Sequence, residues 1–237
     1  MPYFYYGDFL SFRYMLLVAA ILFAALAQAR VTSNFNKYSA LRNHRGITGA
    51  EAARMMLDSN GLVNVRIERI RGKLTDHYDP RNRVLRLSDS VYGESSVSAV
   101  SVACHEAGHA LQHANNYVPL KVRNGIVPLV NFSSRFAWIL IFLGIVTSAA
   151  GSYISDMAFN IGILMFVAVI VFHLITLPVE FNASSRAMEQ MELAGIIDAD
   201  EKKPARKVLS AAAMTYVASL TIAIAQLIRL LAIRDRD

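Results

Sequence analysis

Residues 95–113 read SSVSAVSVACHEAGHALQH, and this stretch guides the interpretation of the whole chain. Its apolar residues recur at helical spacing and its two leading serines are suitable N-caps, so we expect a helix that runs to about Asn115. Residues four positions apart lie on the same side of a helix, one turn along. His105 and His109 therefore face the same way, within a segment that matches the pattern H-E-x-x-H.

The H-E-x-x-H pattern is typical of a catalytic zinc site on one helix face. Two imidazole nitrogens bind the ion, and the intervening Glu106 is close enough to reach a water molecule on it. Zinc lowers the pKa of that water to about 7, so a carboxylate can take its proton. We therefore predict His105 and His109 as metal ligands and Glu106 as general base. The alternative is a helix whose two histidines are merely exposed or hydrogen-bonded.

A catalytic zinc site also needs a third protein ligand and an open fourth position. His113 is the nearest candidate, but it lies eight residues after His105, which is about 12 Å along a helix axis. Metal–ligand bonds of about 2 Å cannot span that distance. Metzincins bend the chain at a glycine before their third histidine, whereas this chain has Gln112 there. The third ligand must therefore come from elsewhere, and His113 is expected at the surface or beside the ligands.

The composition indicates a membrane protein. Hydrophobic residues make up 54% of the 237, above the roughly 45–50% of soluble domains. The single cysteine, Cys104, excludes an internal disulfide, and we expect it to be a buried thiol and not a metal ligand. The net charge of +6 then reports topology and contact with anionic headgroups of the lipid bilayer. Basic and aromatic residues are not interleaved, so no nucleic-acid partner is expected.

The first apolar run, Tyr14–Ala29, predicts an N-terminal membrane anchor over residues 1–30. A cleaved signal peptide is the alternative, because residues 27–29 read Ala-Gln-Ala. The charge asymmetry favours the anchor, with the following segment in the cytoplasm. One basic residue, Arg13, precedes the run, whereas four basic residues follow it: Arg30, Lys37, Arg42 and Arg45.

Residues 31–133 are interpreted as a zincin-like catalytic domain in the cytoplasm. A capping box at Thr48 and Glu51, together with Gly61, predicts a helix over about residues 49–60. Two further segments alternate apolar and polar residues as strands do, and a turn is expected between them. The predicted strands are Asn64–Ile70 and Arg83–Leu87, and the turn is Tyr78–Asn82. In zinc peptidases of this design an edge strand beside the metal pairs with extended substrate.

Residues 134–178 predict a membrane helical hairpin, with apolar runs over Phe136–Ile154 and Met157–Leu177 and its tip outside the cell. We expect Pro178 to end the second run. Residues 179–207 are rich in basic residues and are assigned to the cytoplasm. Residues 208–237 form the last membrane helix and tail, although the arginines near the C-terminus conflict with an outside location, so its orientation stays open. The predicted fold is a mainly α membrane protein with about four membrane helices and a small α+β domain carrying the motif helix.

Glu180 stands out because an acidic residue at the mouth of a membrane helix is costly. Solvation at the membrane interface is one explanation, and a role as the third zinc ligand is the other. Glu189 and Glu192 are the alternative ligands, although they are expected on a solvated helix face.

Five long segments resemble the YugP-type neutral zinc metallopeptidases of the bacterial inner membrane, nearly end to end along the chain. They are TGAEAARMMLDSNGL (48–62), LTDHYDPRNRVLRLSDSVY (74–92), VACHEAGHALQH (102–113), LPVEFNASSRA (177–187) and RKVLSAAAMTYVA (206–218). The resemblance implies a membrane-embedded gluzincin with Zn2+. More distantly the chain is similar to HtpX-type peptidases, whose third ligand is a glutamate in the context E-x-x-A-D. Glu180 and Ala183 fit that context, which nominates Glu180 as the ligand, whereas Ser184 stands where those enzymes have an acid.

Together these features predict a membrane-bound zinc endopeptidase that faces the cytoplasm and hydrolyses peptide bonds. Its expected partners are the lipid bilayer and a polypeptide substrate, either membrane-protein segments or unfolded chains. Three residues are candidate donors to the oxyanion, and His173 is a functional candidate or a packing residue. The candidate donors are His77, Arg186 and Tyr216.

Two alternatives belong to other functional classes. One is a non-catalytic, zinc-stabilised membrane scaffold or adaptor, for which a general base such as Glu106 would be unnecessary. The other is a membrane scaffold or transporter subunit with an accidental motif, although four apolar runs are too few and too poor in charge for a transport path.

Overall fold

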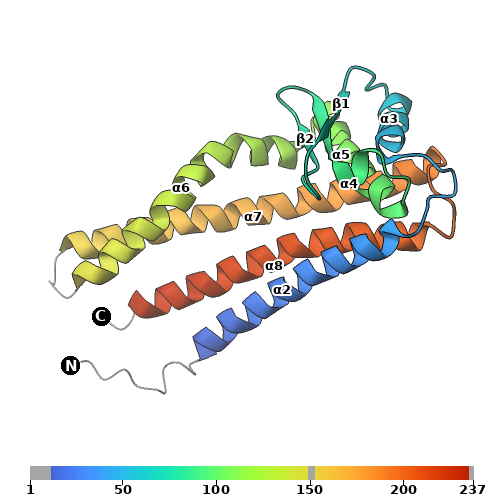
Figure 1. Cartoon of the computed structure of the whole chain (residues 1–237). Coiled ribbons are helices and arrows are strands. Elements are labelled where there is room, and N and C mark those ends of the chain that lie inside the picture. Colours follow the sequence, from blue (N-terminus) through green and yellow to red (C-terminus); the bar gives the residue numbers. More distant parts are fainter. Residues whose placement is uncertain (1–11, 149–152, 235–237) are drawn as a thin grey trace. The chain divides into compact units, whose positions relative to one another are not determined.

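The computed structural model describes residues 12–148 and 153–234 (Figure 1). The start of the predicted anchor and the end of the tail lie outside these residues. The chain divides into two compact units. Met1–Leu26, Val122–Thr176 and Tyr216–Asp237 make up the first, here called the helical unit. Ala27–Lys121 and Leu177–Thr215 make up the second, here called the mixed unit.

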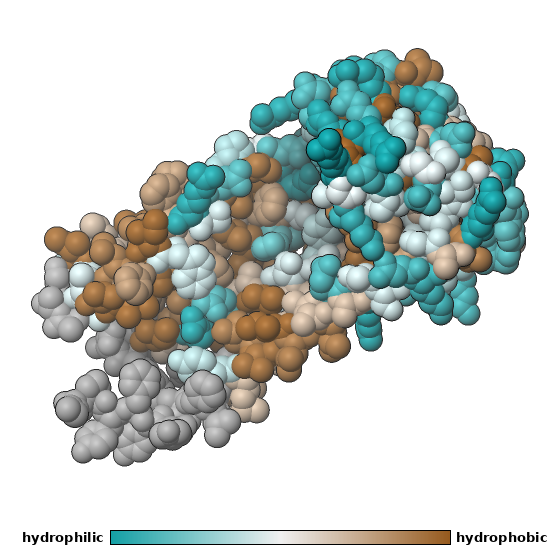
Figure 2. Space-filling view, viewed as in Figure 1, coloured by the Kyte–Doolittle hydropathy of each residue, from teal (hydrophilic) through white to brown (hydrophobic). Residues whose placement is uncertain are grey.

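Four helices are long and apolar enough to cross a membrane. They are α2 (Phe12–Ser39), α6 (Val118–Ser148), α7 (Tyr153–Leu193) and α8 (Lys202–Arg234). Figure 2 shows hydrophobic side chains gathered over helices of the helical unit. Large apolar side chains such as Phe142 and Leu164 are exposed there, as expected for a lipid-facing surface. We predicted about four membrane helices, and four of the described helices have the length and composition to cross a membrane, so this number is confirmed.

Helix α7 passes through Pro178 without ending, so the helix continues beyond the second apolar run, which we expected this proline to end. Val179, Ala183, Ala187 and Met191 follow at four-residue intervals and are fully buried. These residues form one apolar helix face, and its burial outweighs the hydrogen bond that a proline removes. Glu180 therefore lies within a helix, two residues after the proline.

The helices that contain the two apolar runs of the predicted hairpin are longer than the runs themselves. Helix α6 already begins at Val118, and α7 begins at Tyr153. Asp156, which stands between the two predicted apolar runs, lies in the first turn of α7. A carboxylate is favourable there because the N-terminal end of a helix carries partial positive charge.

Two helices of the mixed unit begin at the capping residues that the sequence predicts. In α3 (Gly49–Ser59) Thr48 and Glu51 form the capping box, and Gly61 has a φ of 74° just beyond the end. The motif helix, α5 (Val97–Ala114), begins after Ser96, whose side chain accepts a hydrogen bond from Ala99 N. A short helix, α4 (Asp89–Tyr92), precedes it.

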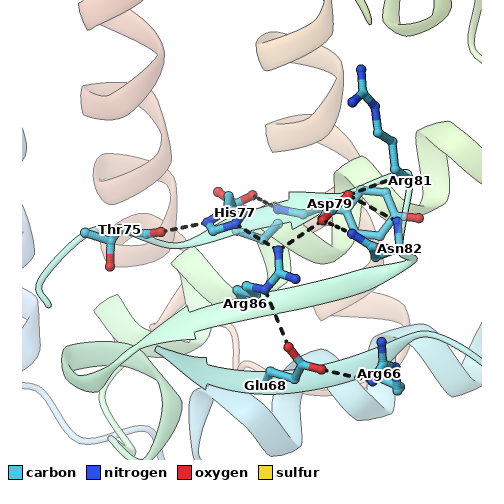
Figure 3. Close-up of polar contacts among 10 residues, drawn as sticks. Arg66, Glu68, Thr75, His77, Asp79, Arg81, Asn82 and Arg86 are labelled. Atoms are coloured by element: carbon cyan, nitrogen blue, oxygen red, sulfur yellow. Dashed lines mark hydrogen bonds and ion pairs between the residues drawn. The ribbon is translucent and has the colours of Figure 1, made fainter. Parts of the chain in front are cut away.

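A three-stranded sheet packs against α5 and has the order β1-β3-β2. The predicted strands are confirmed as β1 (Arg66–Ile70) and β3 (Val84–Ser88), which run parallel. β2 (His77–Asp79) is antiparallel to β3, so the expectation of a turn from Tyr78 onward is wrong. The turn comes after the strand, because Asp79 accepts hydrogen bonds from the backbone of Arg81 and the amide of Asn82 (Figure 3).

The hydrophobic core of the mixed unit lies between α3, α5, the sheet and the buried face of α7. Cys104 is fully buried in this core, as predicted, and burial raises the pKa of its thiol. The motif helix is therefore fixed on its inner side, which leaves its histidine-bearing face to meet α7.

Candidate metal centre

His105, His109 and Glu180 converge at one point. Glu180 Oε2 lies 3.3 Å from His105 Nε2 and 3.6 Å from His109 Nε2. Ligand atoms around a tetrahedral zinc, with bonds of about 2.0–2.2 Å, are separated by about 3.3–3.6 Å. Helix α5 supplies the two histidines and α7 supplies the glutamate. The donor set and its spacing fit a zinc ion, and the structure brings together the three residues expected as ligands.

Two polar side chains hold the histidine rings from behind. Ser184 Oγ lies 3.2 Å from His105 Nδ1, and Gln112 Oε1 lies 2.9 Å from His109 Nδ1. Such contacts at the second ring nitrogen orient a ligand histidine and raise its basicity. We did not predict these partners from the sequence, although their helical spacing is a signal that could have found them. Gln112 is three residues after His109, and Ser184 is four residues after Glu180.

The buried amide of Gln112 fixes the tautomer of His109. Its Nε2 donates to the carbonyl oxygen of Val179 at 2.8 Å and to Asn182 Oδ1 at 3.0 Å. Because Gln112 Oε1 can then only accept, His109 Nδ1 is the donor and His109 Nε2 keeps its lone pair. Gln112 thus ties the ligand helix α5 to α7 and leaves the His109 nitrogen available for a metal.

Glu106 lies beside this centre on the side of the sheet. It is partly buried, and its Oε2 accepts a hydrogen bond from the backbone N–H of Tyr78 in β2 at 3.2 Å. Burial raises the pKa of Glu106 to about 7. A carboxylate with such a pKa both takes up and gives back a proton near neutral pH.

Asp76 is a further acid near the centre and was not predicted from the sequence. Its carboxylate accepts hydrogen bonds from the backbone N–H and hydroxyl of Ser88, at 2.7 and 3.0 Å. Burial raises the pKa of Asp76, and its negative charge contributes to the raised pKa of Glu106.

The other predicted candidates are elsewhere. His77 Nδ1 lies 3.0 Å from the carbonyl of Thr75, and its Nε2 lies 3.5 Å from Arg86 Nη1 on the sheet (Figure 3). His113 is outside the ligand group, as expected, and pairs with the hydroxyl of Tyr78 at 2.9 Å. Arg186 donates to Asn182 Oδ1 at 2.8 Å. Two remaining candidates belong to the helical unit: His173 and Tyr216.

The alternative third ligands do not join the histidines. Among the described residues, the group that contains His105 and His109 takes Glu180 and neither Glu189 nor Glu192. Glu192 instead pairs with Lys202 at 2.9 Å.

The sequence profile of a protein family described as "putative neutral zinc metallopeptidase" matches residues 13–235. The chain belongs to this family. A relative from Bacillus subtilis strain 168, described as "putative membrane protease YugP", is 48% identical over 214 residues, which cover 90% of this chain and 92% of that protein. No solved structure matches the chain. Family membership, as the resemblance predicted, is thus confirmed, and the family implies zinc as the cofactor.

Proposed function

We propose that this protein is a membrane-bound, zinc-dependent endopeptidase with a gluzincin-type site in a zincin-like domain. The observation that carries the proposal is the convergence of two imidazole nitrogens on Glu180 Oε2, at 3.3 and 3.6 Å, with Glu106 beside them. His105, His109 and Glu180 would hold the ion. When bound, zinc would lower the pKa of a coordinated water to about 7 and polarise the scissile carbonyl.

Glu106 supplies the proton transfers of the proposed reaction. Its carboxylate takes a proton from the attacking water, whose oxygen then bonds to the carbonyl carbon of the peptide. The C–N bond breaks, and Glu106 delivers the proton to the leaving amine. The hydrogen bond from Tyr78 N to Glu106 Oε2 holds the carboxylate in place while it changes its protonation state.

Strand β2 supports a role in binding extended substrate. It is an edge strand, because β3 covers one of its sides and β1 lies beyond β3. Its Tyr78 bonds to the general base through the backbone, so a polypeptide paired with this edge would pass next to Glu106. Membrane-protein segments and unfolded chains can adopt the extended conformation that such pairing needs.

We place the protein in the bacterial inner membrane with the active site on the cytoplasmic side. The basic residues between the last two predicted spans, including Lys202, Lys203, Arg206 and Lys207, support this orientation through the positive-inside rule. A cytoplasmic location predicts that a cysteine introduced at exposed Glu94, in a variant that lacks Cys104, is labelled by an impermeant maleimide only after the cells are opened. Labelling of intact cells contradicts the orientation.

Zinc content and casein cleavage test the function on the purified full-length protein. The isosteric variant Glu106→Gln should keep its zinc and lose cleavage, whereas Glu180→Gln should lose both. Glu189→Gln is the matched control, because it removes a carboxylate of α7 outside the ligand group. Zinc without Glu106-dependent cleavage would favour the non-catalytic scaffold. A protein that binds no zinc would contradict both the peptidase and the zinc-stabilised scaffold.

A further inference from the structure

A pocket with a volume of ≈ 450 Å³ lies in the mixed unit beside β2 and the C-terminal half of α5. Its wall includes Asn64, Tyr78, Arg83, Ala110, His113 and Asn116. The proposed mechanism uses none of these side chains. The pocket is therefore a separate feature whose role has to be argued from its place and its charge.

The pocket adjoins the general base through two elements. Tyr78 donates its backbone N–H to Glu106 and lines the pocket with its side chain. Ala110 and His113 follow Glu106 by four and seven residues, so all three lie on one face of α5. A polypeptide that pairs with β2 next to Glu106 would therefore place a nearby residue at this pocket.

The wall of the pocket carries an unneutralised positive charge. Among the described residues that line it, none is acidic, and Arg83 is the one that is always charged. The Arg83 guanidinium makes no hydrogen bond or ion pair with any residue in the described part of the chain. Arg83 is close enough to Tyr78 for its charge to act on the pKa of that phenol, which burial, the largest effect, and the charge of Asp79 raise and Arg83 lowers.

The acidic residues on the sheet are committed to other partners (Figure 3). Asp79 accepts from Asn82 at 2.8 Å and from Arg86 at 3.0 Å. Glu68 pairs with Arg66 at 3.1 Å and with Arg86 at 3.5 Å. Arg83 is thus left as a cation that can accept an external partner.

The backbone of the pocket wall is left-handed at two positions. Arg83 and Asn116 have φ values of 51° and 54°. Asparagine adopts this conformation readily after a helix end, whereas at an arginine it is uncommon. Uncommon backbone conformations cluster at active sites and ligand clamps.

We propose that this pocket is a substrate subsite that binds a carboxylate of the polypeptide, with Arg83 as its counter-ion. The proposal rests on the peptidase function above and adds a substrate class to it: extended segments with an acidic residue a fixed distance from the scissile bond. Arginine suits this role because its planar fork binds both oxygens of a carboxylate. The carboxylate can be that of an aspartate or glutamate side chain, or the C-terminus of the substrate.

Peptide binding to the zinc-loaded full-length protein in detergent tests the proposal independently of cleavage. The probes are extended peptides that differ in one internal residue, Glu or Gln, and each is made with a free and an amidated C-terminus. Binding is measured on the Glu106→Gln protein so that no peptide is consumed. The internal Glu peptide should bind about tenfold more tightly than its Gln counterpart. A preference for the free C-terminus instead would assign the carboxylate to the chain end and support the same pocket.

Substitution of Arg83 decides whether the pocket is responsible. Arg83→Gln should abolish the preference and Arg83→Glu should reverse it. Arg81→Gln is the matched control, because this arginine is two residues away, exposed and outside the pocket wall. Equal binding of all peptides up to millimolar concentration, or equal loss in the Arg81 and Arg83 variants, overturns the proposal.

Cleavage mapping separates this proposal from the proposed function. Glu106-dependent cleavage whose sites do not change in Arg83→Gln would overturn the subsite and leave the peptidase in place. Arg83-dependent binding without any Glu106-dependent cleavage would support the carboxylate pocket and count against the peptidase.

Discussion

Gly108 of α5 lies directly against the backbone of Ala183 in α7. A Cβ on Gly108 would lie 2.7 Å from the carbonyl oxygen of Ala183, which is closer than real Cβ contacts allow. The glycine sits between the predicted ligand His109 and the predicted base Glu106, and Ala183 lies one turn after Glu180. This contact therefore controls how near Glu180 comes to the two histidines.

Gly108→Ala should push the two helices apart. The overpacked contact should destabilise the fold by about 1–3 kcal/mol and also weaken zinc binding. Thermal unfolding in detergent and zinc titration measure the two effects. Gly93→Ala is the control, since a Cβ there would meet nothing within 4 Å. Unchanged zinc affinity in Gly108→Ala would show that the α5–α7 spacing does not set the ligand geometry.

Gln112→Ala should lower the zinc affinity by about 10- to 100-fold, because His109 loses the partner that orients its ring. The same substitution frees the carbonyl of Val179 and leaves a cavity, so stability falls as well. To separate the two losses, zinc binding is compared with that of Met56→Ala, a cavity variant in the core outside the ligand group. Equal zinc affinity in the two variants would argue against an orienting role.

Ser184→Asp should maintain or raise the zinc affinity. A carboxylate at this position would accept a stronger hydrogen bond from His105 Nδ1 than the serine hydroxyl, which lies 3.2 Å from it. Ser184→Ala should weaken binding, because nothing then holds the ring from this side. Isothermal titration with zinc should rank the affinities in the order Ser184→Asp, wild type, Ser184→Ala, from tightest to weakest. The reverse order would mean that the serine does not orient His105.

Asp76 predicts a pH dependence of stability. Its folded pKa is raised by burial, so between its unfolded pKa of about 3.9 and the higher folded value the native state binds more protons than the unfolded state. The contribution of Asp76 to the free energy of unfolding therefore falls as the pH rises from the unfolded pKa to the folded pKa. Asp76→Asn should flatten the decrease in melting temperature with pH. Parallel curves for wild type and variant would show that Asp76 does not titrate there.

Some of the fold could be predicted from sequence because local chemistry determines it. Thr48, Glu51 and Gly61 bound α3, and Ser96 starts the motif helix, each through contacts within a few residues. β2 could not be found in this way, because three residues carry little periodicity and the strand exists through pairing with β3.

Tertiary packing decided the rest. The continuation of α7 through Pro178 depends on the burial of residues such as Val179 and Ala183, which the local sequence does not reveal. For the centre, helical spacing gave His105, Glu106 and His109, but it left several acids open as third ligand. The resemblance nominated Glu180, and only the fold brings it within 3.6 Å of both histidines.

Zinc X-ray absorption spectroscopy of the full-length protein reports which atoms bind the ion. We expect two imidazole nitrogens at about 2.0–2.1 Å and oxygen ligands from a carboxylate and water, with no sulfur. Glu180→Gln should lose the ion or change the spectrum, whereas Glu189→Gln should leave both unchanged. A sulfur ligand, a third imidazole, or an identical spectrum in Glu180→Gln would contradict the proposed centre.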